Sequence, residues 1–154
     1  MAKLALSKLG LTKNQEVVEF SYGENIVQVL KYLDVAKKST LINAAVRGSV
    51  INGVVDDTLV DAYLHMFILE NYTNISLSPK QKESLLDTFD ILESNKFFEA
   101  LIANMNPDEY TYIFSVAKKL TESLNEYNRT FTSLINDPRL KLDQIIDKVS
   151  GQTL

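Results

Sequence analysis

Apolar and polar side chains alternate in one short stretch near the start of the chain. The alternation covers Glu16 to Tyr22 and resumes from Ile26 to Val29, after the segment Gly23-Glu24-Asn25. The apolar face of the first half carries Val18, Phe20 and Tyr22. Period-two alternation is typical of strands, and Gly and Asn tolerate the positive φ of tight hairpin loops. The pattern predicts a short N-terminal β-hairpin, which must pack on another element because an isolated hairpin is marginally stable in water.

After residue 34 the apolar positions recur with the period of a helix. The expected helices span residues 35–47, 57–72, 79–92, 96–104, about 108–135, and 139–149. Asp34, Ser78 and Asn106 are residue types that cap helix N-termini, and a proline follows two of them at the first helical position. Residues 48–56 are expected to form a loop. The fold class is therefore mainly α: a multi-helix bundle with a short N-terminal β-hairpin and one long helix.

Two of these helices show which side faces the core. The helix at 57–72 is predicted to be the core helix, with a broad apolar stripe of Leu59, Val60, Tyr63, Leu64, Phe67 and Ile68. The helix at 79–92 is expected to point Leu85, Leu86, Phe89 and Leu92 inward. With 45% hydrophobic and 23% charged residues, the chain can bury one continuous core. We expect a single domain over residues 1–154, with flexible ends at 1–15 and 150–154.

The aromatic residues of the long helix suggest a contact surface. Tyr112, Tyr127 and Phe131 are expected on its inward stripe, whereas Tyr110 and Phe114 fall on a flanking side. A wide buried face in a helical bundle explains the same spacing, because bundle helices commonly bury more than one stripe. If the flanking side is open, Tyr and Phe are residue types that interfaces favour. The predicted protein-contact residues are Phe20, Tyr22, Tyr110 and Phe114.

The chemistry that the chain can assemble is narrow. It has no cysteine and no tryptophan, and His65 is its one histidine. Asp61 lies one helical turn before His65 and could orient the imidazole, but no serine sits in a recognisable nucleophile motif nearby. Acidic residues near 56–61 are explained by capping at a helix start, because their spacing matches no calcium loop. The segment 48–53 is not a phosphate loop. We therefore predict no catalytic residue, no cofactor, no metal and no enzyme activity.

Charge and hydropathy restrict the partners. The net charge of −4 and the scatter of the sixteen basic residues argue against nucleic acid as the main ligand. No apolar run approaches the roughly 20 residues that span a bilayer, and lysines interrupt the apolar residues at the very start. We therefore expect no membrane partner and a protein made and kept in a cytoplasm.

Two stretches carry a family resemblance. The first is Val29-Leu30-Lys31-Tyr32-Leu33-Asp34-Val35-Ala36-Lys37-Lys38, directly after the expected hairpin, and the second is Glu70-Asn71-Tyr72-Thr73-Asn74-Ile75. With the helices between them they resemble small proteins encoded among the structural genes of tailed bacteriophages, which typically have a Tyr-Leu-Pro-like step and a Tyr-Thr-Asn-Ile step there. Here Asp34 stands where a proline is common, which replaces a ring by a potential cap. The resemblance covers about a third of the chain.

The resemblance implies a bacteriophage virion or assembly protein that works by protein–protein contact, such as a neck or head–tail connector component. Its partners would then be other virion proteins and further copies of itself in a homo-oligomer. Its location would be the host cytoplasm during assembly and the virion afterwards. The alternative is a phage-encoded inhibitor that binds a host protein through its acidic surface.

Overall fold

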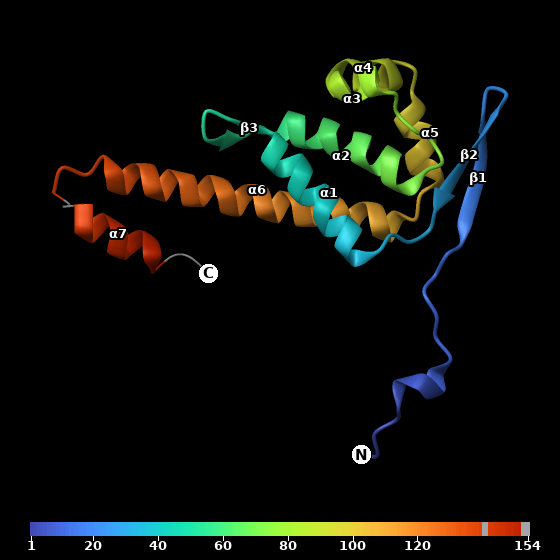
Figure 1. Ribbon diagram of the computed structural model, residues 1–154, viewed down its shortest axis with the longest axis horizontal. Coiled ribbons are helices and arrows are strands. Elements are labelled where there is room, and N and C mark those ends of the chain that lie inside the picture. Colours follow the sequence, from blue (N-terminus) through green and yellow to red (C-terminus); the bar gives the residue numbers. More distant parts are fainter. Residues whose placement is uncertain (140–141, 152–154) are drawn as a thin grey trace.

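The computed structural model describes residues 1–139 and 142–151 (Figure 1). It confirms a mainly α protein with a two-stranded hairpin near the N-terminus. The strands are β1 (Val17–Tyr22), β2 (Asn25–Leu30), β3 (Val50–Ile51) and β4 (Val54–Val55). The helices are α1 (Val35–Gly48), α2 (Asp57–Tyr72), α3 (Pro79–Glu83), α4 (Leu85–Ser94), α5 (Phe97–Asn104), α6 (Pro107–Ile135) and α7 (Leu142–Ser150), and a short 3-10 turn covers Leu6–Leu9.

The N-terminal hairpin forms where the alternation predicted it. β1 and β2 are antiparallel, and a two-residue loop closes them, in which Gly23 has a φ of +62°. The side chains of Val27 and Val29 are buried against the helices. On the other edge of β2, Gln28 N donates to Asn74 Oδ1 at 2.9 Å, and Val29 bridges Thr73. The hairpin is therefore joined to the end of α2.

The segment expected to be a loop between α1 and α2 is instead a second hairpin. β3 and β4 pair antiparallel, with Val50 opposite Val55. Asn52 and Gly53 occupy the turn with φ values of +51° and +79°. Two consecutive positive φ angles are the requirement of a type I′ turn, and Asn-Gly is the pair that meets it most readily. The expectation of a loop was wrong because this Asn-Gly turn signal outweighs the shortness of the strands.

The α2 helix lies at the centre of the core, but only half of its predicted stripe is buried: Val60, Leu64 and Ile68 are buried, whereas Leu59, Tyr63 and Phe67 are half-buried. Met66 and Leu69, outside that stripe, are fully buried. Asp56 caps it by accepting a hydrogen bond from Leu59 N at 3.1 Å. The fully buried side chains of the core include Ile42, Val46, Leu64, Met66, Leu69, Phe98, Leu101 and Ile113. These come from α1, α2, α5 and α6, so the core lies where these four helices meet.

Two local expectations are corrected. The helix predicted over 79–92 is interrupted at Ser84, whose φ of −126° and ψ of 60° are not helical. Of the four side chains expected inward, Leu85, Phe89 and Leu92 pack against the core, whereas Leu86 stays 37% exposed. Asp34 holds the N-cap position of α1, but its side chain makes no capping hydrogen bond. Its carboxylate pairs with Lys13 Nζ at 2.8 Å instead.

The long helix α6 runs from Pro107 to Ile135, which confirms the prediction. Its buried residues follow one another at intervals of four: Glu109, Ile113, Ala117 and Thr121. Tyr112, Tyr127 and Phe131 were expected on the inward stripe, yet they are 45%, 36% and 38% exposed. Tyr112 lies one position off the buried row, and the other two follow its last member. The second half of α6 contacts β4 and α7 rather than the core helices (Figure 1).

One buried polar network joins segments that are distant in the sequence. Glu109 Oε1 accepts from Lys38 Nζ at 2.9 Å, and Glu109 Oε2 accepts from the Tyr72 hydroxyl at 2.6 Å and from Leu33 N at 3.2 Å. The side chains of Lys38 and Glu109 are only 8% and 9% exposed. The Lys38 ammonium also lies 4.4 Å from the centre of the Tyr32 ring. The network ties the start of α6 to the start of α1 and the end of α2.

The network also determines the protonation of its members. Burial raises the pKa of Glu109, but hydrogen bonds from Lys38, Tyr72 and Leu33 stabilise its charged form and together leave this pKa below its ordinary value. Burial, and then the Glu109 carboxylate, raise the pKa of Tyr72 well above its ordinary value. Glu109 is therefore ionised and Tyr72 is a neutral donor at physiological pH.

Glu109→Gln is expected to lower the free energy of unfolding by roughly 3 kcal/mol, because it leaves the buried Lys38 ammonium without its counter-charge. Glu122→Gln, at an exposed position of the same helix, is the matched control and should change it by less than about 0.5 kcal/mol. Urea denaturation followed by circular dichroism measures both. The double variant Lys38→Met/Glu109→Leu should recover most of the loss, and a double variant as unstable as Glu109→Gln would contradict this account.

The contribution of Glu109 is expected to depend on pH. A carboxyl whose pKa is lower in the folded state stabilises the fold above its unfolded pKa of about 4.3, and this stabilisation disappears as pH falls through the folded pKa. The difference in unfolding free energy between the wild type and Glu109→Gln should therefore be largest near pH 7 and shrink below about pH 4. Urea denaturation at a series of pH values measures the difference, and a constant difference would rule out the ionised carboxylate as the stabilising species.

Candidate functional site

A groove of about 520 Å³ lies between α2 and α6 and is the strongest candidate for a binding site. We call it the α2–α6 groove; its lining residues are Asp57, Val60, Asp61, Leu64, Tyr110, Thr111, Phe114, Ser115, Ala117, Lys118 and Thr121. Val60, Leu64 and Ala117 are buried core residues at its base. Two carboxylates, Asp57 and Asp61, come from α2, and one ammonium, Lys118, comes from α6. The groove therefore combines apolar walls with a mainly acidic α2 side.

His65 packs beside this groove in a ring of aromatic side chains. Its centre is 5.1 Å from that of Phe98 and 5.2 Å from that of Phe114. His65 Nδ1 is 2.8 Å from the carbonyl oxygen of Asp61, which can only accept, so Nδ1 carries the proton in the neutral ring. Nε2 then accepts from the Tyr110 hydroxyl at 3.2 Å. His65 is thus more deeply enclosed than a histidine at the edge of a helix face, and both of its ring nitrogens are engaged.

The Tyr110 hydroxyl stays protonated in this surrounding. Burial raises its pKa first, and the nearby carboxylates of Asp61 and Glu93 raise it further because they oppose a phenolate. A neutral Tyr110 can donate to His65 Nε2 when the imidazole is neutral. The pair therefore acts as a polar tether between α2 and α6 at one end of the groove.

The structure places the four predicted contact residues in two separate places. Tyr110 and Phe114 pack against each other with ring centres 4.5 Å apart, and both line the α2–α6 groove. Phe20 and Tyr22 lie on the inner face of the N-terminal hairpin and pack on Phe97, and the Tyr22 hydroxyl donates to Asn95 O at 2.8 Å. All four side chains are half-buried against their own chain. Tyr110 and Phe114 are therefore walls of a groove rather than a freely projecting face.

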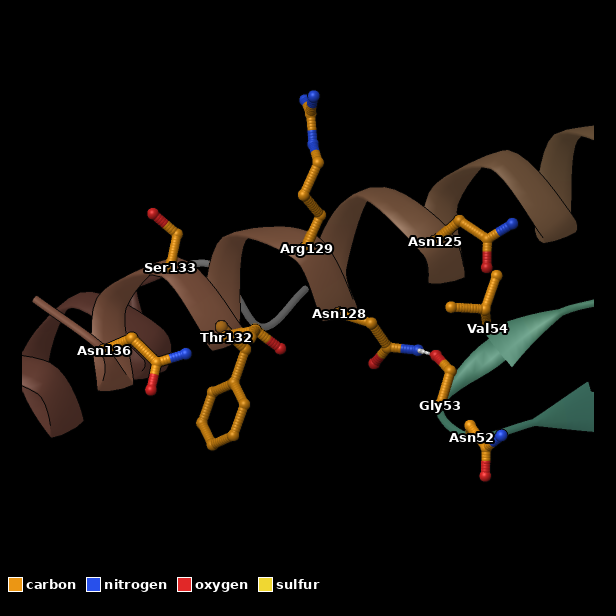
Figure 2. A pocket seen from close by; sticks show the side chains of 10 residues that line it. Asn52, Gly53, Val54, Asn125, Asn128, Arg129, Thr132, Ser133 and Asn136 are labelled. Atoms are coloured by element: carbon orange, nitrogen blue, oxygen red, sulfur yellow. Dashed lines mark hydrogen bonds between the residues drawn. The ribbon is translucent and has the colours of Figure 1, made fainter.

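A second groove, of about 700 Å³, lies between the β3–β4 hairpin and the second half of α6 (Figure 2). We call it the amide groove; its lining residues are Asn52, Gly53, Val54, Asn125, Asn128, Arg129, Phe131, Thr132, Ser133 and Asn136. The Asn128 side chain points at the hairpin and donates to Gly53 O at 2.6 Å, as Figure 2 shows. Asn125 Oδ1 accepts from Val55 N at 2.9 Å. Both amides are committed to holding the hairpin on α6.

Sequence reasoning missed the amide groove, although two signals were present. One signal is the Asn-Gly turn flanked by valine and isoleucine, and the other is the pair of asparagines three residues apart on the long helix. The Arg129 side chain extends away from the hairpin in Figure 2. Its Nη2 atom donates to both carboxylate oxygens of Glu126 at 2.8 Å. The groove therefore offers amide and hydroxyl groups with little uncompensated charge.

The first sixteen residues form an arm that leaves the body of the protein at β1 (Figure 1). Every residue of the arm is exposed, including its four leucines: Leu4, Leu6, Leu9 and Leu11. The Lys13–Asp34 ion pair ties the base of the arm to the start of α1. Exposed leucines that cluster in one segment indicate a surface that another molecule covers.

Within the part of the chain that the structure describes, no group of three or more His, Cys, Asp or Glu residues is arranged to hold a metal ion. None of the described helices combines the length and the apolar character that a bilayer crossing requires.

Comparison with protein-family models, with curated proteins and with solved structures found no match to this chain.

Phe114→Ala is expected to lower the free energy of unfolding by about 2 kcal/mol, because it removes a ring that packs on both His65 and Tyr110. Phe131→Ala is the matched control, since it removes the same side chain from an exposed position of the same helix. The control should change the free energy of unfolding by less than about 0.5 kcal/mol. Urea denaturation measures both variants, and equal losses would show that Phe114 has no special role in joining α2 to α6.

Proposed function

We propose that this protein is a bacteriophage virion or assembly protein that acts through protein–protein contacts. Within that role we propose a neck or head–tail connector component, in which a multi-helix bundle is repeated around a ring. The family resemblance of the first two helices and their flanking segments supports the phage origin. The partners would be other virion proteins and copies of the same chain, and the protein would pass from the host cytoplasm into the virion.

The observation that carries this proposal is the amount of apolar surface left uncovered at the two ends of the molecule. At one end the arm exposes its four leucines. At the other end the second half of α6 exposes Tyr127, Phe131 and Ile135. Exposed apolar clusters that are absent from most monomeric surfaces mark sites of association, and aromatic side chains are the ones that interfaces favour. Two such regions on different parts of one chain suit a protein with more than one neighbour.

The edge of the N-terminal hairpin supports the same proposal. β2 is covered on its outer edge by Asn74, whereas β1 pairs with β2 alone in the described chain. An open strand edge offers backbone donors and acceptors to a further strand. β1 is therefore available to a neighbouring subunit or to another virion protein.

A second candidate function, the phage-encoded inhibitor of a host protein, is favoured by the distribution of charge. The first fifteen residues carry three lysines and no acidic residue, so residues 16–154 carry a formal charge of −7 within the total of −4. An acidic body of this size can compete for a basic surface on a host protein. This function would need a free monomer or dimer.

Light scattering behind a sizing column distinguishes the two functions. For the assembly protein we expect a discrete high-order oligomer whose mass stays constant over a tenfold range of concentration, and the protein should also be detected by mass spectrometry in purified phage particles. The inhibitor would instead be a monomer or dimer, would be absent from particles and would bind one host protein at a fixed stoichiometry. A monomer that is also absent from particles would overturn the assembly proposal.

A further inference from the structure

The chemistry of the arm identifies the kind of surface that it fits. Leu6 and Leu9 begin and end the 3-10 turn, in which side chains three residues apart eclipse each other. They therefore project together from one side of the arm, and they are 74% and 50% exposed. Lys3 and Lys13 lie on either side of this pair and Lys8 lies within it, and no acidic residue occurs before Glu16. The arm is thus a basic segment with a pair of apolar anchors at its centre.

The α2–α6 groove has the complementary chemistry. Its apolar walls include Leu64, Phe114 and Ala117, which can cover leucine side chains. Asp57 and Asp61 along its α2 side can face lysines, and Lys118 is its one opposing cation. Its volume of about 520 Å³ lies within the range of about 300–1,000 Å³ that is typical of ligand sites.

The amide groove fits the arm less well. Val54 and Phe131 contribute apolar surface to its wall, so the leucines alone do not distinguish the two grooves, and the difference between them lies in their charge. Its one charged lining residue is the cation Arg129, which cannot attract the lysines of the arm. Of these two grooves, the α2–α6 groove is therefore the one whose charge matches the lysines of the arm.

We propose that the N-terminal arm of one copy of this protein docks in the α2–α6 groove of a neighbouring copy, with Leu6 and Leu9 between the walls and with Lys3 and Lys8 beside Asp57 and Asp61. Leu9 and Leu6 lie four and seven residues before the anchor at Lys13, and with the 3-10 turn between them they can reach roughly 13 and 19 Å from it, so the neighbouring groove must lie within that distance. The inference rests on the proposed function, because it names the contact by which copies of this chain would associate.

This contact is heterologous, because the arm of one subunit meets the groove of the next and leaves a free groove and a free arm at the ends. Such head-to-tail contacts generate a ring when the rotation between subunits closes, and an open filament when it does not. Repetition around a closed ring engages every arm and every groove. The arm contact therefore deepens the proposed ring by giving it a polarity and a repeating contact.

Disulfide trapping tests the contact directly, because the natural chain contains no cysteine. One full-length protein carries Leu6→Cys in the arm and a second carries Ser115→Cys in the wall of the groove. The two are mixed, allowed to exchange subunits and oxidised under mild conditions. We expect a disulfide-linked heterodimer on a non-reducing gel, and mass spectrometry should identify the peptide pair. Because the two cysteines are on different chains, this product cannot arise within one subunit.

The matched control pairs the same Leu6→Cys protein with Ser133→Cys, which places an exposed cysteine on the same helix but in the amide groove. The heterodimer yield with Ser115→Cys should exceed the yield with this control at least tenfold. Leu6→Asp/Leu9→Asp in the otherwise natural chain should lower the mass in light scattering to that of smaller species. Ile91→Asp, at an exposed apolar position of α4, should leave the mass unchanged.

The outcomes separate this inference from the proposed function. A discrete oligomer with equal cross-linking at the two grooves, or one whose mass survives Leu6→Asp/Leu9→Asp, would overturn the arm contact and leave the assembly role intact. A chain that stays monomeric and is absent from particles would overturn both. Selective trapping at Ser115→Cys together with loss of the oligomer in the arm variant would establish the contact.

Discussion

The fold depends most on the burial of one carboxylate, Glu109, at the start of α6. Its two oxygens accept hydrogen bonds from Lys38 of α1, from Tyr72 at the end of α2 and from the backbone N–H of Leu33. Leu33 lies in the segment that leads from the hairpin into α1. A charge in such a place destabilises the fold unless every partner is present, so these three segments are held in one arrangement. The positions of the walls of the α2–α6 groove depend on this network, because the network fixes where α6 crosses α2.

Periodicity predicted the elements of the fold well and the partners of individual side chains less well. The hairpin, α2 and the full length of α6 follow from patterns that are strong over many residues. The exposed positions of Tyr112, Tyr127 and Phe131 do not, because the buried row of α6 uses the smaller residues Ile113, Ala117 and Thr121 and ends after them. The break at Ser84 depends on one backbone conformation and leaves no mark in the hydrophobic pattern.

The candidate site shows the same division. Tyr110 and Phe114 were identified from the sequence as a pair on one side of the long helix, and they do form one wall of a groove. Their contact with His65 could not be predicted, because it needs α2 and α6 to be placed side by side. The second hairpin was available from its Asn-Gly turn, whereas its attachment through Asn125 and Asn128 depends on the crossing of elements about 70 residues apart. Local signals specify local geometry, and sites made by two helices need the tertiary arrangement.

The long helix is continuous in shape but belongs to two thermodynamic units. Around Ile113 the helix is enclosed by the core, so we expect its amide hydrogens to exchange with solvent only when the whole molecule unfolds. Beyond Leu124 the helix is supported by a two-residue strand and by α7, and no residue from there to its end is fully buried. We expect the amides of this part to exchange through local opening at a much smaller free energy. The far half of α6 can thus loosen and reform without disturbing the core. It can therefore adapt to a neighbour while the α2–α6 groove keeps its shape.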